Sequence, residues 1–381
     1  MKRLFALFLS LILLTGCVQQ PPQATQSPTI QHTTPPVTDP IPTETEPLSP
    51  LAQLLQSMTT EEKVGQLFLA RCPDTGAAKD AANYHLGGYI LFARDFENET
   101  PDSITKTIGT YQTAASIPML IAVDEEGGTV TRVSRYSVFR ESPFLSPRRL
   151  YDIGGMEKIW ESEIEKSKLL ASLGINVNVG PVCDITTNPD AFMYQRSIGQ
   201  TPSATGEFVQ TVVSTAREYG VGCILKHFPG YGNNTDTHIA IARDNRSLAE
   251  LESSDLIPFK MGIQAGCDAI MVSHVYINAL DAVLPATLSP AAHAYLRENM
   301  EFNGVIVTDD LVMQAITDTY GAGEAAVLAV LAGNDLLCSS EYGVQYQAVL
   351  EAVQSGRISE SQLNTAAERV LRWKQTLGRI E

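Results

Sequence analysis

The sequence predicts an α/β protein whose main domain is a (β/α)8 TIM-like barrel. Eight short apolar runs, many of them rich in β-branched residues, follow one another from residue 64 onward. Segments with helical periodicity separate most of these runs, which is typical of a parallel sheet covered by helices. Polar residues end five of the runs, and eight is the number of parallel strands that closes a barrel.

The expected strands are Val64–Ala70, Gly87–Ala93, Met119–Asp124, Ile175–Asp184, Val221–His227, Ala269–His274, Val305–Asp309 and Asp335–Cys338. The expected helices are Glu157–Leu173, Ala204–Tyr219, Leu248–Ala265, Pro290–Asn299, Gly323–Leu331, Tyr342–Ser355 and Glu360–Leu377. An open doubly wound sheet is the alternative. However, no Gly-x-Gly-x-x-Gly motif follows any of the apolar runs, so nothing supports a dinucleotide site.

Residues 1–16 are predicted to be a lipoprotein signal peptide. Two basic residues precede an apolar run, Leu4 to Leu14, that is too short to span a bilayer. The run ends in Leu14-Thr15-Gly16-Cys17, which resembles a bacterial lipobox. That resemblance implies cleavage before Cys17, lipidation of Cys17, and a protein anchored to the cell membrane on its extracytoplasmic side. A plain secretory signal is the alternative.

Residues 17–50 are predicted to be a disordered linker that carries the lipid on its first residue. Residues 18–50 hold 9 of the 21 prolines of the chain, with glutamine, threonine and serine between them. Such a segment buries too little apolar surface to offset the entropy lost on ordering. Residues 51–381 remain for one large domain with a sizeable core.

The composition restricts the partners of this domain. A formal net charge of −16 argues against nucleic acid and against a basic membrane-binding patch. We therefore expect the lipid to be the only membrane contact, and we expect a monomer. The five cysteines after Cys17 are widely spaced and form no Cys-x-x-Cys motif, so they predict neither a disulfide framework nor a zinc site.

The polar residues at the strand ends indicate a functional site. These residues are Asp124, Asp184, Lys226 with His227, His274, and Asp309. In a (β/α)8 barrel the carboxyl ends of all strands meet at one face, which is the face that carries active sites. Any one of these side chains alone could be a capping or core residue, but five strands ending in this way predict a site.

The segment 226–238 is the richest in possible catalytic groups. Lys226 and His227 end an apolar strand, and Pro229 and two glycines then open a polar loop. That loop ends in Asp236-Thr237-His238. If it is extended there, Asp236 can orient the ring of His238, which then presents its other nitrogen for proton transfer. A surface loop that happens to contain two histidines is the alternative.

Two further segments contribute to the predicted site. Asp309 ends the strand Val305–Val307 and is placed to act as a nucleophile or to stabilise a cation, whereas Asp310 could simply cap the following turn. The segment 124–132 combines acids, glycines and Arg132. Aspartate and arginine at such a rim suit a ligand rich in hydroxyl groups, although an exposed charged loop is the alternative.

With these motifs assembled, the chain resembles glycoside hydrolase family 3, and most closely its β-N-acetylglucosaminidases of the bacterial cell-wall recycling type. The family motif Lys-His-Phe-Pro-Gly is intact at 226–230, and its Asp-(Ser/Thr)-His dyad matches 236–238. The motif Asp-Gln-Glu-Gly-Gly-Arg-Val-x-Arg corresponds to 124–132, and Arg-Ser-Phe-Gly to 196–199. The resemblance covers nearly all of 51–381 and implies that this domain is a catalytic barrel of the family's N-terminal type.

The resemblance also implies roles for individual residues. Asp309 would form a glycosyl-enzyme, and His238, oriented by Asp236, would serve as the acid and base of a retaining reaction. The residues expected to hold the sugar are Asp124, Arg132, Arg196, Lys226 and His227, with His274 at a neighbouring strand end. The expected substrate is a glycan or muropeptide that ends in β-N-acetylglucosamine. Family members carry cis peptides at Lys226–His227 and Phe228–Pro229, so both are expected here.

Several departures from the family pattern leave the substrate open. Glu125 stands where the family usually has Gln, Thr129 replaces an Arg, Ile198 replaces a Phe, and Tyr231 replaces a His. A β-glucosidase, a β-xylosidase, an N-acetylglucosaminide phosphorylase and a catalytically silent glycan-binding lipoprotein are the alternatives. Attack by the substrate's own N-acetyl group is a competing chemistry, but it leaves Asp309 without a task.

No cofactor or metal is expected. His227, His238 and His274 could be mistaken for a zinc triad, but glycoside transfer needs no Lewis acid.

Overall fold

The computed structural model describes residues 48–380, except for 187, 233–241, 314–315 and 317–318. The predicted signal peptide and almost all of the predicted linker therefore lie outside the described residues. The first described helix, α1 (Pro50–Ser57), begins at Ser49, whose hydroxyl accepts the amide of Ala52 as an N-cap. None of the helices in the described part of the chain has the length and apolar character needed to cross a membrane.

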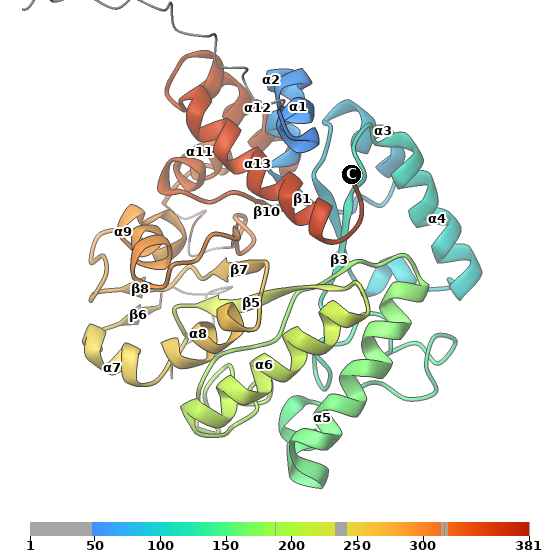
Figure 1. The fold of residues 1–381 in the computed structure, drawn as a ribbon, viewed down its shortest axis with the longest axis vertical. Coiled ribbons are helices and arrows are strands. Elements are labelled where there is room, and N and C mark those ends of the chain that lie inside the picture. Colours follow the sequence, from blue (N-terminus) through green and yellow to red (C-terminus); the bar gives the residue numbers. More distant parts are fainter. Residues whose placement is uncertain (1–47, 187, 233–241, 314–315, 317–318, 381) are drawn as a thin grey trace, which may run out of the picture. The chain divides into compact units, whose positions relative to one another are not determined.

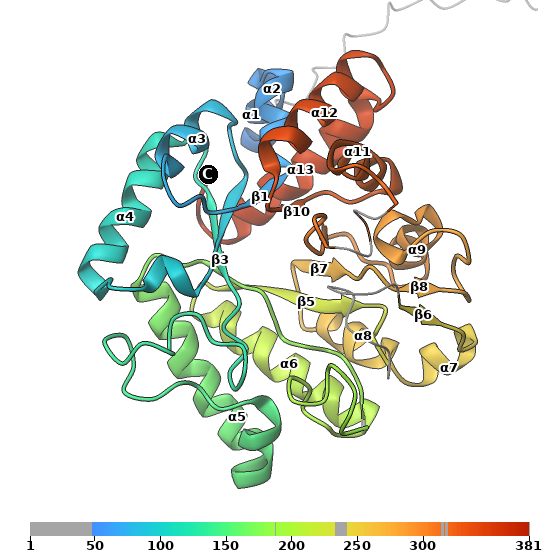
Figure 2. The ribbon, with the colours of Figure 1, turned by 180° about the vertical axis from the view of Figure 1, so that it is seen from behind.

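Eight parallel strands lie at the centre of the domain, and the helices surround them (Figures 1 and 2). In order around the sheet they are β10 (Leu337–Ser339), β1 (Phe68–Arg71), β2 (Gly88–Leu91), β3 (Leu120–Val123), β4 (Val177–Asn178), β5 (Gly222–Phe228), β7 (Ala269–Val272) and β9 (Val305–Thr308). A parallel bridge between Val307 of β9 and Leu336, the residue before β10, joins the two ends of this order. The sheet thus closes, and the predicted (β/α)8 barrel is confirmed.

Each of the eight predicted apolar runs overlaps one barrel strand, but the predicted start of the first run is wrong. Val64 to Gln66 form the last turn of the helix α2 (Thr60–Gln66), and the strand starts only at Phe68. The reason is a capping box, in which Thr59 and Glu62 satisfy each other's backbone amides. This box fixes the start of a helix that continues into the apolar run.

The helices cover the outer face of the barrel. After α1 and α2 they are α3 (Ala77–Asn83), α4 (Pro101–Ala114), α5 (Pro147–Ser172), α6 (Pro202–Glu218), α7 (Leu248–Ser253), α8 (Leu256–Gln264), α9 (Pro290–Ala294), α11 (Ala322–Ala332), α12 (Tyr342–Gln354) and α13 (Glu360–Thr376). The single helix expected over 248–265 is in fact two. Pro258 lies in the first turn of α8 and cannot continue a helix that already contains Ser254, because its ring clashes with that carbonyl.

Alternate residues of the strands form two apolar layers. One set fills the barrel interior, including Leu120, Val177, Ile224 and Val305. The other set packs outward against the helices, including Ile121 and Ile270. A short parallel ribbon, β6 (Arg243–Asp244) with β8 (Tyr276–Ile277), lies outside the barrel sheet. Its two-residue strands are too short to show any periodicity in the sequence.

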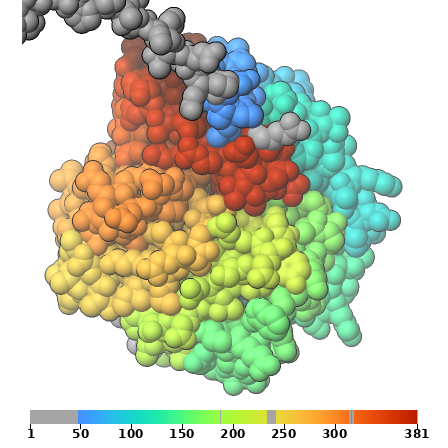
Figure 3. Space-filling model, viewed as in Figure 1, coloured from blue at the N-terminus to red at the C-terminus, as the bar shows by residue number. Residues whose placement is uncertain are grey.

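Helix α13 closes the amino-terminal end of the barrel. Trp373 is buried with the interior residues and lies against Gly222, the first residue of β5. The neighbouring Lys374 is fully buried, and its Nζ lies 2.6 Å from Oε1 of Gln66 at the end of α2. Figure 3 accordingly shows the red C-terminal helices packed against the blue segment that holds α1 and α2. The carboxyl-terminal end is left to the loops that follow the strands.

Candidate active site

A cleft of about 810 Å³ opens at the carboxyl-terminal end of the barrel. Three strands each bring predicted site residues to its wall. Asp124 follows β3, Lys226 and His227 belong to the end of β5, and Asp309 follows β9. Three of the five predicted strand ends therefore converge on this cleft, whereas Asp184 and His274 are not among the residues that line it.

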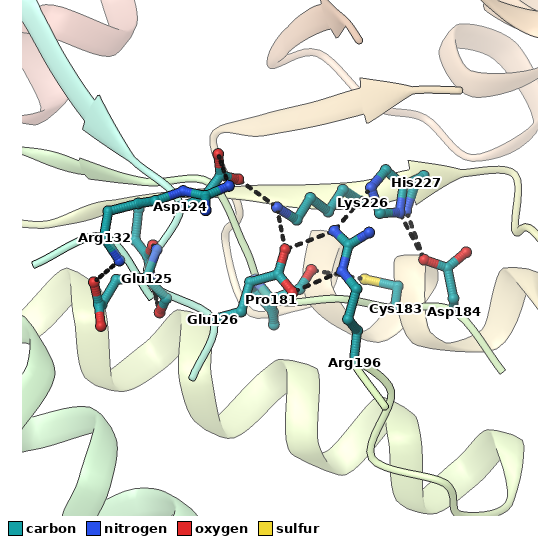
Figure 4. Close-up of polar contacts among 11 residues, drawn as sticks. Asp124, Glu125, Glu126, Arg132, Pro181, Cys183, Asp184, Arg196, Lys226 and His227 are labelled. Carbon is teal, nitrogen blue, oxygen red and sulfur yellow. Dashed lines mark hydrogen bonds and ion pairs between the residues drawn. The ribbon is translucent and has the colours of Figure 1, made fainter. Parts of the chain in front are cut away.

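Lys226 lies at the centre of a network of charged groups (Figure 4). Its side chain is 2% exposed, and its Nζ lies 2.6 Å from Oδ1 of Asp124 and 2.6 Å from Oε1 of Glu126. Burial alone would lower the pKa of Lys226, but the two carboxylates outweigh this effect and raise it. The ammonium group therefore stays charged at neutral pH and can donate its remaining hydrogen to a ligand.

Glu126 joins Lys226 to Arg196. Its two carboxylate oxygens accept a bidentate pair of hydrogen bonds from Arg196, at 2.9 Å from Nε and 2.7 Å from Nη2. Burial would raise the pKa of Glu126, but Lys226 and Arg196 hold it well below its usual range. Bidentate pairing fixes the plane of the guanidinium as well as its position, so Arg196 is rigidly placed at the cleft.

His227 is oriented by Asp184. The imidazole Nδ1 lies 2.8 Å from Oδ2 of Asp184, whose Oδ1 accepts the amide of Tyr231 at 2.8 Å. On its other side, Nε2 of His227 lies 3.4 Å from Nη2 of Arg196. A guanidinium can only donate, so this arrangement favours the tautomer that carries its proton on Nδ1. The peptide bonds Lys226–His227 and Phe228–Pro229 are both cis, as predicted.

The loop after β3 is shaped by Glu125, which turns away from the cleft. Glu125 is fully buried and accepts the backbone amides of Arg132 (2.8 Å) and Val133 (2.7 Å) and the hydroxyl of Ser134. It thus ties the two ends of the loop together. The guanidinium of Arg132 reaches back to the cleft, with Nη2 3.9 Å from Oδ2 of Asp124.

Asp309 and Asp310 have different surroundings. The backbone amide of Asp309 donates to the carbonyl of Val272, which extends the strand pairing by one residue and fixes the start of its side chain at the cleft. The carboxylate of Asp310 instead accepts the amides of Val312 and Ser340, each at 3.2 Å, and the hydroxyl of Ser340. Asp310 therefore caps its own turn and holds it to the end of β10.

His274 lies beneath this turn and is not among the residues that line the cleft. It is fully buried, with Nδ1 3.0 Å from Oγ1 of Thr287 and Nε2 2.9 Å from the carbonyl oxygen of Asp310. The structure thus places His274 as a support of the Asp309–Asp310 turn, and not on the wall where a sugar contact was expected. Asp236 and His238 lie outside the described residues, so their predicted pairing stays a prediction.

Residues 59–373 match the model of the family described as Glycosyl hydrolase family 3 N terminal domain. The chain belongs to glycosyl hydrolase family 3. It is thus a member of a family of glycoside hydrolases, and its barrel is the domain that this model describes.

Several relatives of this family 3 barrel are named for one activity. A β-hexosaminidase of Idiomarina loihiensis is 34% identical over 273 residues, which cover 68% of this chain and 78% of that protein. β-Hexosaminidase LpqI of Mycobacterium tuberculosis is 28% identical over 329 residues, which cover 83% of each chain. A solved family 3 β-N-acetylglucosaminidase from a Paenibacillus species has a TM-score of 0.80 and 35% identity, covering 85% of this chain. The chain spans 63% of that structure and 54% of β-hexosaminidase A of Pseudoalteromonas piscicida.

The family 3 barrel contains site residues for which the sequence predicted no role. Glu126 neutralises two buried cations, and Asp184, singled out only as a strand end, orients His227. One signal for Glu126 was present, since it lies two residues after Asp124 and side chains alternate along an extended segment. The partners of these carboxylates could not be found in this way, because Arg196 lies 70 residues from Glu126 in the chain.

Glu126→Gln is expected to destabilise the fold and to lower kcat/KM. The change removes the carboxylate that pairs with both Lys226 and Arg196. We expect this loss to lower the free energy of unfolding by about 3–5 kcal/mol. Because the pKa of Glu126 is lowered on folding, the wild type should lose this stabilisation as the pH falls below 4.5. Denaturant titrations at several pH values measure both effects.

Glu125→Gln is the matched control. It makes the same chemical change at the adjacent buried position, but Glu125 accepts only neutral donors. The loss there should be smaller, about 1–3 kcal/mol, because hydrogen bonds are weakened but no ion pair is broken. Equal losses in the two variants would mean that the ion pairs of Glu126 contribute no more than ordinary hydrogen bonds.

His238 is outside the described part of the chain, so the expectation that His227, His238 and His274 bind no zinc stays a prediction.

Proposed function

We propose that this family 3 barrel is a retaining exo-β-glycosidase that removes terminal β-N-acetylglucosamine from glycans derived from peptidoglycan or related to it. The observation that carries the proposal is the network of Asp124, Arg196, Lys226 and His227 at the cleft that also holds Asp309. The named activity of the relatives supports the choice of sugar.

The network suits the non-reducing end of a sugar. Lys226 presents a charged donor, Arg196 a planar one, and Asp124 a charged acceptor, and all three are fixed by buried pairs. Vicinal hydroxyl groups need donors and acceptors at fixed spacing, and hydrogen bonds to charged groups are roughly twice as strong as neutral ones. A terminal sugar would therefore be held by its hydroxyl groups, which orients its anomeric carbon.

Two displacements follow from the proposed roles. The carboxylate of Asp309 attacks the anomeric carbon, the glycosidic C–O bond breaks, and His238 gives its proton to the departing oxygen. Water then attacks the glycosyl-enzyme while His238 takes its proton, and Asp309 is released as a carboxylate. Both transition states carry positive charge at the sugar ring, which Asp309 stabilises. Asp236 serves to orient His238 in both steps.

A panel of nitrophenyl β-glycosides, assayed with and without phosphate, tests this proposal. We expect N-acetylglucosaminide to be cleaved with retention, and glucoside and xyloside to be cleaved poorly. Faster turnover in phosphate, with a sugar phosphate as product, would favour a phosphorylase. No cleavage of any member by a folded protein would favour a glycan-binding protein without activity.

We further propose that the protein is anchored by lipid on Cys17 on the extracytoplasmic side of the cell membrane. The support is the Leu14-Thr15-Gly16-Cys17 sequence, which lies outside the described residues. Cys17→Ser should release the protein from the membrane fraction without loss of activity, as measured by fractionation and assay. A variant that still sediments with membranes would require a second membrane contact.

A further inference from the structure

The segment 192–199, part of the loop between β4 and α6, carries Arg196 to the cleft. Phe192, Gln195 and Arg196 of this segment all line the cleft, so its backbone decides where this part of the wall lies. The ion pair with Glu126 fixes only the tip of the Arg196 side chain. The position of the other end depends on what holds the segment itself.

Arg148, in the first turn of α5, contacts this segment and is not among the residues that line the cleft. Its Nε donates to the carbonyl oxygen of Tyr194 and its Nη2 to Oγ of Ser197, each at 3.2 Å. Its Cζ also lies 3.9 Å from the ring centre of Tyr194. One guanidinium thus binds residues on both sides of Arg196 in the chain.

Gly199 leaves the space in which the guanidinium of Arg148 lies. The φ angle of Gly199 is +72°, and a Cβ atom at this position would lie 2.1 Å from Nη1 of Arg148. A residue with a side chain would therefore displace the guanidinium and strain the backbone. Ser197, which accepts from Arg148, is fully buried. The segment is thus folded around the side chain of Arg148.

Neither an ion pair nor the stability of α5 accounts for Arg148. Arg140 and Arg196 have carboxylate partners, whereas the partners of Arg148 within the described residues are a carbonyl oxygen, a hydroxyl and an aromatic ring. A cation in the first turn of a helix opposes the helix dipole. The fixed donors and the flat face of a guanidinium do match these three partners.

We propose that Arg148 is a positioning residue that sets the backbone of segment 192–199, so that Arg196 meets the terminal sugar in the cleft. This inference rests on the proposed function, because it assigns Arg148 an effect on the binding of that sugar. Arg148 acts through Arg196 and does not touch the sugar.

Hydrogen exchange, followed by mass spectrometry, tests the hold on the segment without any substrate. The amides of Arg196 and Ser197 donate to the carbonyl oxygen of Met193, at 3.1 and 2.8 Å, so both should be protected in the wild type. In Arg148→Ala these amides should exchange at least about 10-fold faster. Peptides from the barrel strands should keep the wild-type rates, which shows that the fold is intact. Unchanged exchange in the segment would overturn the inference.

A double-mutant cycle tests whether Arg148 acts through Arg196. On nitrophenyl β-N-acetylglucosaminide, Arg148→Ala should lower kcat/KM about 10- to 100-fold, mainly by raising KM, because a displaced Arg196 loses its contacts with the bound sugar. In an Arg196→Ala background, the same change should lower kcat/KM by less than about twofold. Equal losses in the two backgrounds would overturn the inference, since Arg148 would then act by another route.

Arg149→Ala is the matched control. Arg149 is the next residue of the same helical turn, but its side chain is exposed. This variant should keep exchange in the segment and kcat/KM within about twofold of the wild type. Arg148→Lys is the second variant, for use if alanine prevents folding. It keeps the charge but not the two fixed donors or the flat face, so it should show the same changes at smaller size. Wild-type behaviour of Arg148→Lys would overturn the inference.

The two measurements separate this inference from the proposed function. A wild type that cleaves no glycoside, with exchange that depends on Arg148, would support the hold on the segment and contradict only the hydrolase proposal. Affinity for N-acetylglucosamine, measured by calorimetry, would then replace kcat/KM in the cycle. An active wild type whose exchange does not depend on Arg148 would contradict only the inference.

Discussion

Asp309→Ala is expected to lower kcat by a factor on the order of 10⁴–10⁶ on every β-glycoside, as for removal of other nucleophiles that act within a catalytic unit. Without the carboxylate no glycosyl-enzyme can form, whatever the leaving group. The measurement is the turnover of aryl and natural N-acetylglucosaminides, together with mass spectrometry of the protein after reaction with a slow fluorosugar. The wild type should gain the mass of one sugar, and the variant should not.

The fold of this variant is checked by thermal unfolding and by its affinity for N-acetylglucosamine. Both should stay close to the wild type, because Asp124 and Glu126 provide the ion pairs that hold Lys226 and Arg196 in place. Retained turnover would mean that the N-acetyl group of the substrate is the nucleophile, and Asp309 would then need another role.

His238→Ala should depend on the leaving group. Nitrophenolate departs with little protonation, so the glycosyl-enzyme should still form on the aryl substrate and its hydrolysis should limit the rate. A sugar alcohol leaves poorly without a proton, so activity on a natural disaccharide should fall by a further factor of about 10²–10⁴. Steady-state kinetics on both substrates measure this difference.

Azide tests the role of His238 as the general base of the second displacement. It attacks the glycosyl-enzyme without a general base, so it should partly restore turnover of His238→Ala on the aryl substrate and give a β-glycosyl azide. Asp309→Ala should form no β-azide, because it makes no glycosyl-enzyme. Equal losses of His238→Ala on both substrates, without rescue by azide, would make His238 a binding residue and leave the acid and base unassigned.

The fold could be predicted from the sequence because the barrel strands are buried on both faces. Runs such as 119–123 and 305–307 are therefore continuously apolar and are easily found. The ribbon of Arg243–Asp244 with Tyr276–Ile277 has no such run and depends on a long-range pairing. The capping box at Thr59 also decides locally between helix and strand, which an apolar pattern alone cannot do.

The site was predictable where a side chain follows directly from a strand end, as for Asp124, Lys226 and His227. It was not predictable where the role of a side chain depends on which other residues it contacts in the folded protein. His274 follows the end of β7 by two residues and Asp309 follows the end of β9 by one, and the structure buries His274 fully while Asp309 lines the cleft.

Closure of the barrel through β1 affects how the protein folds while the ribosome is making it. Residues 68–70 pair with 337–339, and Lys374 reaches Gln66 across 308 positions. While the ribosome is still adding the strands between them, β1 has one edge without a partner, and such an edge can pair with other chains. The nascent protein therefore stays prone to aggregation through this edge until residues 337–339 have been made and can pair with β1.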